Sequence, residues 1–177
     1  MLLNISLYGD PVLRAKAVLI PEITSEIRQL AEDMVQTMVG AANGVGLAAP
    51  QVGKSVRLFV IRDEISEADG EFTFAPPEVV INPVFSSPSK ETQIGPEGCL
   101  SIPKIQVDVE RPLKIHVRYQ NLQVEFLEED LEGFRARLFM HENDHLNGTL
   151  IIDRIPANVR KQIDPLLRKI KAKKPIF

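Results

Sequence analysis

The stretch from residue 131 to residue 148 reads LEGFRARLFMHENDHLNG. Its apolar side chains and two histidines recur three and four positions apart, a spacing typical of one face of an α-helix. The residues on that face are Leu131, Phe134, Leu138, His141 and His145. The pattern predicts a helix from Leu131 to about Leu146, with Gly148 as its stop.

The end of this helix contains the pattern HExxH. Residues four apart on a helix lie one turn apart on the same face, so His141 and His145 can bind one metal ion. Glu142 lies beside them, where a carboxylate can take a proton from metal-bound water. In a chain with 3 histidines, this pattern is expected roughly 0.004 times by chance. The segment is therefore a candidate metal-binding helix.

A catalytic metal site of this kind needs at least a third protein ligand. The chain has one cysteine, Cys99, within Glu-Gly-Cys-Leu-Ser at residues 97–101. A thiolate with two imidazoles favours Zn²⁺ or Fe²⁺ over harder cations. Two other uses of Cys99 stay open: a small buried side chain, or a nucleophile activated by His141 or His145.

A third segment, Gly-Val-Gly-Leu-Ala-Ala-Pro-Gln at residues 44–51, follows the first predicted helix. A glycine pair after a helix is usually only a turn. Glycine also lets a backbone approach a ligand closely, and Gln51 could then donate its amide to a developing oxyanion. The segment lacks the preceding strand and third glycine of a dinucleotide-binding loop.

The remaining pattern predicts an α+β domain. A helix is expected from Thr24 to about Ala42, a buried strand over 56–62, a surface excursion over 63–78, and a strand over 79–85 that Pro83 would place at a sheet edge. Alternating apolar residues over 105–109, 113–119 and 122–126 predict an antiparallel meander. The expected fold is a mostly antiparallel sheet packed around the central HExxH helix, with an N-terminal and a C-terminal helix.

Composition narrows the class of protein. An apolar content of 44% and a net charge of -3 over 177 residues fit one globular domain and argue against a surface built as a whole for nucleic acid. The longest apolar runs are too short for a transmembrane helix, and the N-terminus lacks the features of a signal peptide. A single cysteine excludes an internal disulfide framework and points to a reducing compartment. We therefore expect a cytoplasmic protein, or the mature form of an organellar one, without membrane or DNA partners.

Together and in this order, the segments 44–51, 97–101 and 141–145 resemble the three signature motifs of peptide deformylases. The first matches the form GxGLAAPQ, the second matches EGCLS without change, and the third matches HExDH. The segment Tyr8–Arg14 is also similar to the N-terminal segment of the family, so the resemblance covers about residues 5–155. One departure is Met140, where the family usually has glutamine.

The resemblance implies a metal-dependent hydrolase that acts in protein biosynthesis. Cys99, His141 and His145 would hold one divalent metal ion, typically Fe²⁺ in this family and often replaced by Ni²⁺ or Zn²⁺. Glu142 would be the general base and acid. The substrate would be the formyl-methionine at the N-terminus of a nascent polypeptide.

The implied reaction releases formate and a free N-terminal methionine. Metal-bound hydroxide would attack the formyl carbon, and Glu142 would pass the proton to the leaving amine. Gln51 and the backbone N–H of Leu100 would stabilise the oxyanion, while Gly46 would bind the main chain of the substrate.

Further side chains are candidates for the pocket and for support of the ligands. The methionine side chain needs an apolar pocket, for which the candidates are Val45, Phe134 and Leu138, although ordinary core residues would look the same. Neighbours normally orient metal ligands, and Glu97 and Asp144 are placed to do so. We expect Asp144 to pair with Arg111, which would tie the histidine helix to the sheet.

The C-terminal segment is strongly basic. Residues 160–177 carry seven basic side chains and one acidic side chain, a local charge of +6 against -9 for the rest of the chain. We expect residues 1–155 to form the catalytic part and residues 156–177 a basic helix or tail of the same domain. The charge is either a solvated face or a surface for the phosphates of ribosomal RNA near the exit tunnel.

Two other functions stay open from the residues alone. HExxH is also the signature of zinc metallopeptidases, which would need a different third ligand. The metal could instead be structural, in an inactive binding module, and a closed site with four protein ligands would favour that function.

Overall fold

The computed structural model describes residues 1–41, 44–66 and 72–173. The helices are α1 (Ser25–Gly40), α2 (Gly133–Leu146) and α3 (Ala157–Lys171), with short 3₁₀ helices η1 (Pro11–Arg14), η2 (Ala49–Val52) and η3 (Ile151–Asp153). The strands are β1 (Gly46–Ala48), β2 (Leu58–Ile61), β3 (Glu64–Ser66), β4 (Phe72–Phe74), β5 (Glu78–Ser86), β6 (Thr92–Cys99), β7 (Ile102–Pro112), β8 (Lys114–Gln120) and β9 (Phe126–Glu132).

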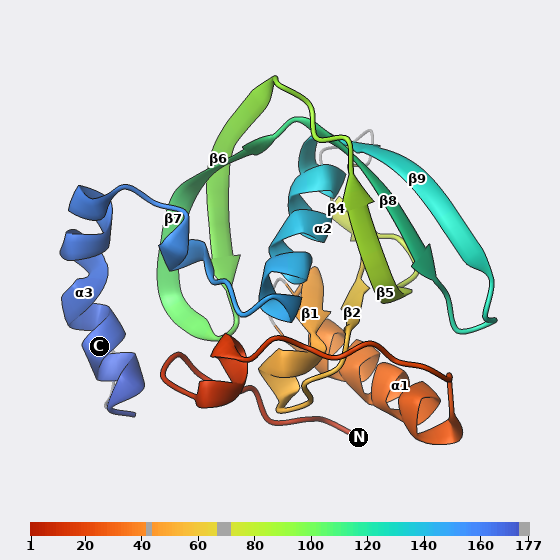
Figure 1. The fold of residues 1–177 in the computed structure, drawn as a ribbon. Coiled ribbons are helices and arrows are strands. Elements are labelled where there is room, and N and C mark those ends of the chain that lie inside the picture. The colour runs from red at the N-terminus through yellow and green to blue at the C-terminus, as the bar shows by residue number, and fades with distance from the viewer. Residues whose placement is uncertain (42–43, 67–71, 174–177) are drawn as a thin grey trace.

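The strands form three antiparallel sheets. Five strands in the order β1-β2-β5-β8-β9 make the main sheet, while β3 pairs with β4 and β6 pairs with β7. Figure 1 shows α2 in the middle of the molecule, between the β6–β7 hairpin and the main sheet, with α1 below and α3 at one side. The predicted α+β fold with a mostly antiparallel sheet around a central helix is confirmed.

Packing explains why α2 is central. Its residues Phe139 and Leu146 are fully buried in one cluster with Phe59 of β2 and Val117 of β8. The rings of Phe59 and Phe139 meet edge to face, with centroids 5.5 Å apart, a favourable aromatic arrangement. The main sheet therefore fixes one side of α2 and leaves the opposite side, which carries the histidines, toward the β6–β7 hairpin.

The N-terminal helix lies close to its predicted position. Thr24 caps α1 by accepting a hydrogen bond on its side-chain oxygen from the backbone N–H of Ile27, at 3.4 Å. Met34 and Met38 are fully buried against the main sheet. The helix ends at Gly40, and the predicted end at Ala42 lies outside the described residues.

The predicted meander is wrong in two respects. The strand β7 pairs with β6 rather than with β8, so residues 92–112 form a separate hairpin. Most of the third predicted strand, 122–126, is a turn, and only Phe126 belongs to a strand. The side-chain oxygen of Asn121 accepts hydrogen bonds from the backbone N–H groups of Gln123 and Glu125, and Val124 has a φ of 67°. The true strand, β9, runs to Glu132, so α2 begins at Gly133 rather than at Leu131.

The predicted edge position of Pro83 is also wrong. The strand β5 lies in the middle of the main sheet, between β2 and β8, and its register shifts between Ile81 and Val84. Asn82 leaves the ladder there with a φ of 51°, and its side chain bonds both the N–H and the C=O of Ile20. A β-bulge therefore accommodates a proline that a regular central strand would exclude.

The surface excursion predicted over 63–78 contains a short exposed hairpin, β3–β4, and residues 67–71 lie outside the described residues.

Near the C-terminus, α3 is part of a hydrophobic core. Leu167 and Ile170 are buried in a cluster with Leu13, Val107 and Leu150. The domain boundary predicted at residues 155 and 156 stays a prediction.

Gly148, two residues after the end of α2, allows a test of how closely the N-terminal segment packs against that helix. Gly148 has a φ of 71°, and a Cβ there would lie 2.5 Å from the carbonyl oxygen of Arg14. Gly53 has a similar φ of 77° but no neighbour within 4 Å of its Cβ position. Gly53→Ala should cost about 1–2 kcal/mol from the backbone conformation alone. Gly148→Ala should cost at least about 1–2 kcal/mol more, because the backbone of Arg14 must also move.

The measurement is the free energy of unfolding in urea for both variants and the unsubstituted protein. Equal losses in the two variants would contradict the close contact between Gly148 and Arg14.

Candidate functional site

A cavity of about 540 Å³ lies where α2, the β6–β7 hairpin and the loop before β1 meet. All three sequence motifs contribute to its wall. The lining residues include Gly44, Val45, Gly46, Gln51, Glu97, Cys99, Leu100, Phe134, Leu138, His141 and Glu142. The fold thus brings together segments that lie about 50 residues apart in the chain.

Three side chains of types that bind metals converge beside this cavity. Cys99 is the last residue of β6, and His141 and His145 lie one turn apart on α2. One ligand atom from each residue lies within 4.8 Å of the others, and the Cys99 Sγ is 3.3 Å from Nε2 of His145. The ring centroids of the two histidines are 5.2 Å apart. One divalent ion can therefore contact all three side chains.

The donor set fits a metal ion on two further observations. Burial alone would raise the pKa of Cys99, but the positive charge and hydrogen bonds of His145 and His141 outweigh it and lower the pKa to about 5. The side chain is thus biased toward the thiolate, the form that binds metals. Nδ1 of His145 and Oε2 of Glu142 are buried without a hydrogen-bond partner among the described residues. Buried polar atoms normally have a partner, and a bound ion or water can be that partner.

The carboxylate of Glu142 lies close to the backbone of Gly46, the first residue of β1. A Cβ on Gly46 would be 2.2 Å from Oε1 of Glu142, so only glycine allows this approach. Burial raises the pKa of Glu142 to about 6, although the nearby His141 and His145 partly oppose that shift. The carboxylate and the backbone of Gly46 therefore border the same small volume.

Gln51 is held in a fixed orientation in η2. Its Oε1 accepts a hydrogen bond from the N–H of Ala48 at 2.9 Å, so its Nε2 is directed toward Ser101 at 3.2 Å and the Cys99 Sγ at 3.5 Å. The N-terminal segment supports this arrangement, because the N–H of Ser6 donates to the carbonyl of Gln51 at 2.7 Å. Ser101 is not among the residues predicted for the site, although it belongs to the second motif.

The candidate pocket residues all line the cavity, but differ in exposure. Leu138 is buried, whereas Phe134, in the first turn of α2, is 51% exposed. Leu100 and Val45 also line the cavity and are partly buried. The apolar wall therefore reaches from the interior to the surface.

A buried ion-pair network lies behind the histidines. Glu97 accepts hydrogen bonds from Nε and Nη2 of Arg111 at 2.6 and 2.8 Å, and its Oε2 is 2.9 Å from Nδ1 of His141. Burial would raise the pKa of Glu97, but these bonds outweigh it and hold the pKa well below its usual range. The predicted pair of Asp144 with Arg111 is present at 2.9 Å, and Arg154 also contacts Asp144. Arg137 is a further member of the network that the sequence did not predict.

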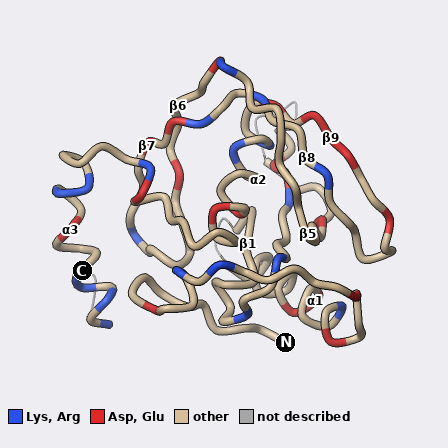
Figure 2. Tube along the Cα trace, in the orientation of Figure 1, with Lys and Arg blue, Asp and Glu red and all other residues tan. Residues whose placement is uncertain are grey.

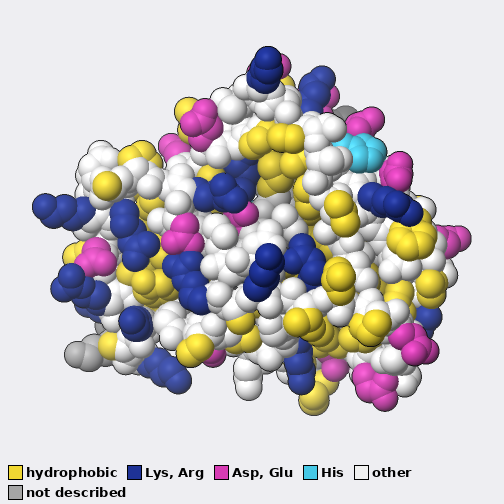
Figure 3. All heavy atoms as spheres, in the orientation of Figure 1, with side chains coloured by type: hydrophobic (Ala, Val, Ile, Leu, Met, Phe, Trp, Pro, Cys, Tyr) yellow, Lys and Arg dark blue, Asp and Glu magenta, His cyan; other side chains and the backbone are white. Residues whose placement is uncertain are grey.

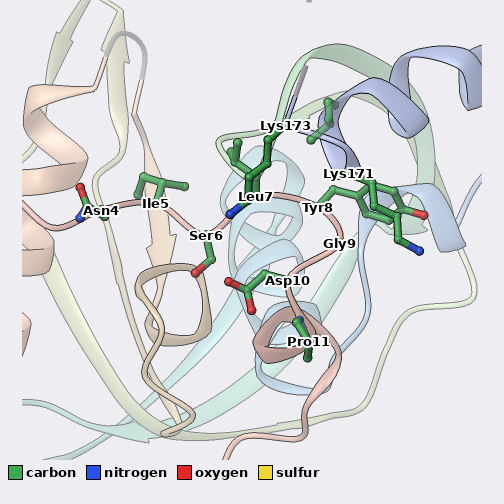
Figure 4. A pocket seen from close by; sticks show the side chains of 11 residues that line it. Asn4, Ile5, Ser6, Leu7, Tyr8, Gly9, Asp10, Pro11, Lys171 and Lys173 are labelled. Carbon is green, nitrogen blue, oxygen red and sulfur yellow. The ribbon is translucent and has the colours of Figure 1, made fainter. Parts of the chain in front are cut away.

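A second cavity, of about 570 Å³, lies between the N-terminal segment and the end of α3 (Figure 4). Its wall consists of residues 4–11 with Ile170, Lys171 and Lys173. These lining residues include one carboxylate, that of Asp10, but no cysteine or histidine. The group of cysteine and histidine side chains that could hold a metal ion therefore borders the first cavity.

Comparison with known proteins agrees with this geometry. The family model for polypeptide deformylase matches residues 2–161. A peptide deformylase from Thermotoga neapolitana is 47% identical over 94% of this chain and 92% of its own length. One from Thermotoga maritima is 45% identical over 95% of this chain and 98% of its own length.

Solved structures give the same result. The crystal structure of the Thermotoga maritima peptide deformylase has a TM-score of 0.78, with 88% of this chain and 99% of that chain covered at 45% identity. The peptide deformylase from Thermus thermophilus has a TM-score of 0.85, with 98% of this chain and 99% of that chain covered at 40% identity.

No helix among the described residues is long and apolar enough to cross a membrane. The chain belongs to the peptide deformylase family, metal-dependent hydrolases that act on formylmethionyl peptides.

Proposed function

We propose that this protein removes the formyl group from the N-terminal formyl-methionine of nascent polypeptides and releases formate. The observation that carries the proposal is the convergence of Cys99, His141 and His145 within 4.8 Å beside a cavity that also contains the carboxylate of Glu142. Three protein ligands and an open side are typical of a catalytic rather than a structural metal site.

The three ligands would hold one divalent ion, and we propose Fe²⁺, with Ni²⁺ or Zn²⁺ as substitutes. A thiolate and two imidazoles are suitable ligands for each of these ions. Glu97 occupies Nδ1 of His141, so its Nε2 is left for the ion. When bound, the ion would supply Lewis acidity and lower the pKa of water in the site.

The chain's own groups would carry the proton and the developing charge. Glu142 lies within the cavity with one oxygen free, so it can accept a proton from water and deliver it to the leaving amine. The oriented Nε2 of Gln51 and the N–H of Leu100 would stabilise the oxyanion. The backbone of Gly46, at the cavity wall, would bind the main chain of the substrate.

The methionine side chain would contact the apolar wall formed by Val45, Phe134 and Leu138. The contact between Gly46 and Glu142 leaves little space near the reacting carbon. A formyl group fits such a site better than an acetyl group, because the latter adds a methyl group. Asp144 and Arg111 would support the ligands indirectly, by tying α2 to β7.

The basic helix α3 favours a partner beyond the peptide itself. Figures 2 and 3 show lysines and arginines along α3, and Lys161, Arg168 and Lys169 are exposed. We propose that this face contacts ribosomal RNA near the exit tunnel, in the bacterial cytoplasm, where formylated chains emerge. Leu167 and Ile170 of the same helix are buried, so a test must keep the helix in place.

The first prediction concerns Glu142. Glu142→Gln should keep the metal but reduce formate release from formyl-Met-Ala-Ser about 10²–10⁴-fold, because the amide cannot transfer the proton. Glu132→Gln, an exposed change just before α2, is the matched control and should retain full activity. The measurement is the rate of formate release from protein loaded anaerobically with Fe²⁺. Full activity in Glu142→Gln would rule out proton transfer by Glu142. If the unsubstituted, metal-loaded protein releases no formate, the proposed deformylase activity is refuted.

The second prediction concerns the contact above Glu142. Gly46→Ala places a methyl group 2.2 Å from the present position of Oε1 and must displace the carboxylate. We expect kcat to fall about 10²-fold with an unchanged metal content, because misplacing a reacting group by about 1 Å has this effect. Gly53→Ala, outside the cavity, is the control. An unchanged kcat would show that the approach of Gly46 to Glu142 is not needed.

The third prediction concerns α3. The triple change of Lys161, Arg168 and Lys169 to glutamine removes three exposed positive charges without touching the buried residues. Co-sedimentation with ribosomes should weaken, and the slope of log affinity against log salt should become shallower by about three. Hydrolysis of a short formyl peptide should not change. Ribosome binding equal to that of the unsubstituted protein would exclude the docking role.

A further inference from the structure

Arg137 is a buried cation in the wall of the candidate active site. It lies on α2 one turn before His141, and only 5% of its surface is exposed. It lines the same cavity as Glu142 and Cys99 but belongs to none of the three sequence motifs. Burying a guanidinium is costly unless it is paired and hydrogen-bonded.

The guanidinium of Arg137 connects α2 to both strands of the β6–β7 hairpin. Its Nη1 donates to the carbonyl of Val109 on β7 at 2.8 Å and to the carbonyl of Gly95 on β6 at 3.3 Å. Its Nη2 donates to the carbonyl of Gln93, also on β6, at 3.0 Å. One side chain from the helix therefore holds the backbone of the hairpin at three places.

The same guanidinium also reaches a ligand through one intermediate. Nη1 of Arg137 donates to Oε1 of Glu97 at 2.8 Å, and Oε2 of Glu97 is 2.9 Å from Nδ1 of His141. Arg111 contacts Glu97 from β7, within the hairpin itself. Arg137 is thus the cationic partner of Glu97 that comes from the helix.

This arrangement matters because the candidate ligands come from two separate elements. Cys99 belongs to the hairpin, whereas His141 and His145 belong to α2. The described hairpin is a two-stranded sheet of its own, so the main sheet does not fix its position by strand pairing. Some other contact must set the distance between the thiolate and the imidazoles.

We propose that Arg137 is a positioning residue of the metal centre, which holds the hairpin with Cys99 at a fixed distance from the two histidines of α2. The inference rests on the metal site of the proposed function. An arginine suits this task because its planar fork donates to several acceptors in fixed directions, whereas a lysine offers one point charge.

The test uses Co²⁺ in place of the native ion, because its absorption spectrum reports the geometry of the ligands directly. Arg137→Gln and Arg137→Lys both remove the fork, and the second keeps the charge. Arg135→Met is the matched control: Arg135 lies on the same helix and pairs with Glu78 and Glu129, away from Glu97. Circular dichroism establishes that each variant is folded.

We expect both Arg137 variants to show altered cobalt absorption bands and to release the ion to a chelator about 10–100-fold faster than the unsubstituted protein. Arg135→Met should keep the spectrum and the release rate, even though it also loses partly buried ion pairs. A wild-type spectrum and release rate in either folded Arg137 variant would overturn the proposal. If the unsubstituted protein binds cobalt without thiolate–cobalt absorption, Cys99 is not a ligand and the metal site of the proposed function is refuted. This outcome differs from a failure of the role proposed for Arg137, in which the unsubstituted protein shows that absorption and the Arg137 variants do not change it.

Discussion

The candidate site depends on the burial of one carboxylate, that of Glu97. It contacts Arg111, Arg137 and His141, which come from β7 and α2, so it joins the hairpin and the helix at one point. Charges buried in this way are stable only when every partner is present, and loss of one partner typically costs about 3–5 kcal/mol. Hydrophobic contacts have no preferred direction, whereas hydrogen bonds do. The network therefore adds directional constraints on the positions of His141 and of the hairpin.

The sequence predicted the parts of the site that are local. His141 and His145 lie on one helix face because of a spacing of four residues, and the 44–51 and 97–101 motifs carry Gln51 and Cys99 in short segments. The predictions failed where contacts beyond the local pattern decide the structure. The alternation over 122–126 suggests a strand, but the side chain of Asn121 bonds the backbone of the next residues and forms a turn. A β-bulge likewise places Pro83 in a central strand.

Arg137 and Ser101 illustrate the same limit at the site. An arginine four residues before a histidine on a helix is usually a surface residue, and no local pattern reveals that a hairpin covers it. Ser101 belongs to a recognised motif, but its contact is with Gln51, 50 residues earlier in the chain. Local periodicity carries no information about such pairs, because their members lie on elements that are distant in the sequence. The spacing of four residues places Arg137 on the same helix face as His141, but it does not show what covers that face.

The close approach of Gly46 to Glu142 follows from the packing of α2 on the main sheet. The main sheet fixes β1 by pairing Gly46 with Ile61 of β2, and packing of Phe139 fixes the height of α2 against that sheet. Glu142 lies three residues after Phe139, almost one turn further along the helix, so its position follows from the same packing. The histidines on the neighbouring face also contact the hairpin. Glu142 and the two histidines therefore share one rigid helix that packs on the main sheet, whereas Cys99 comes from the separate hairpin. The geometry of the candidate site depends on how α2 contacts both sheets.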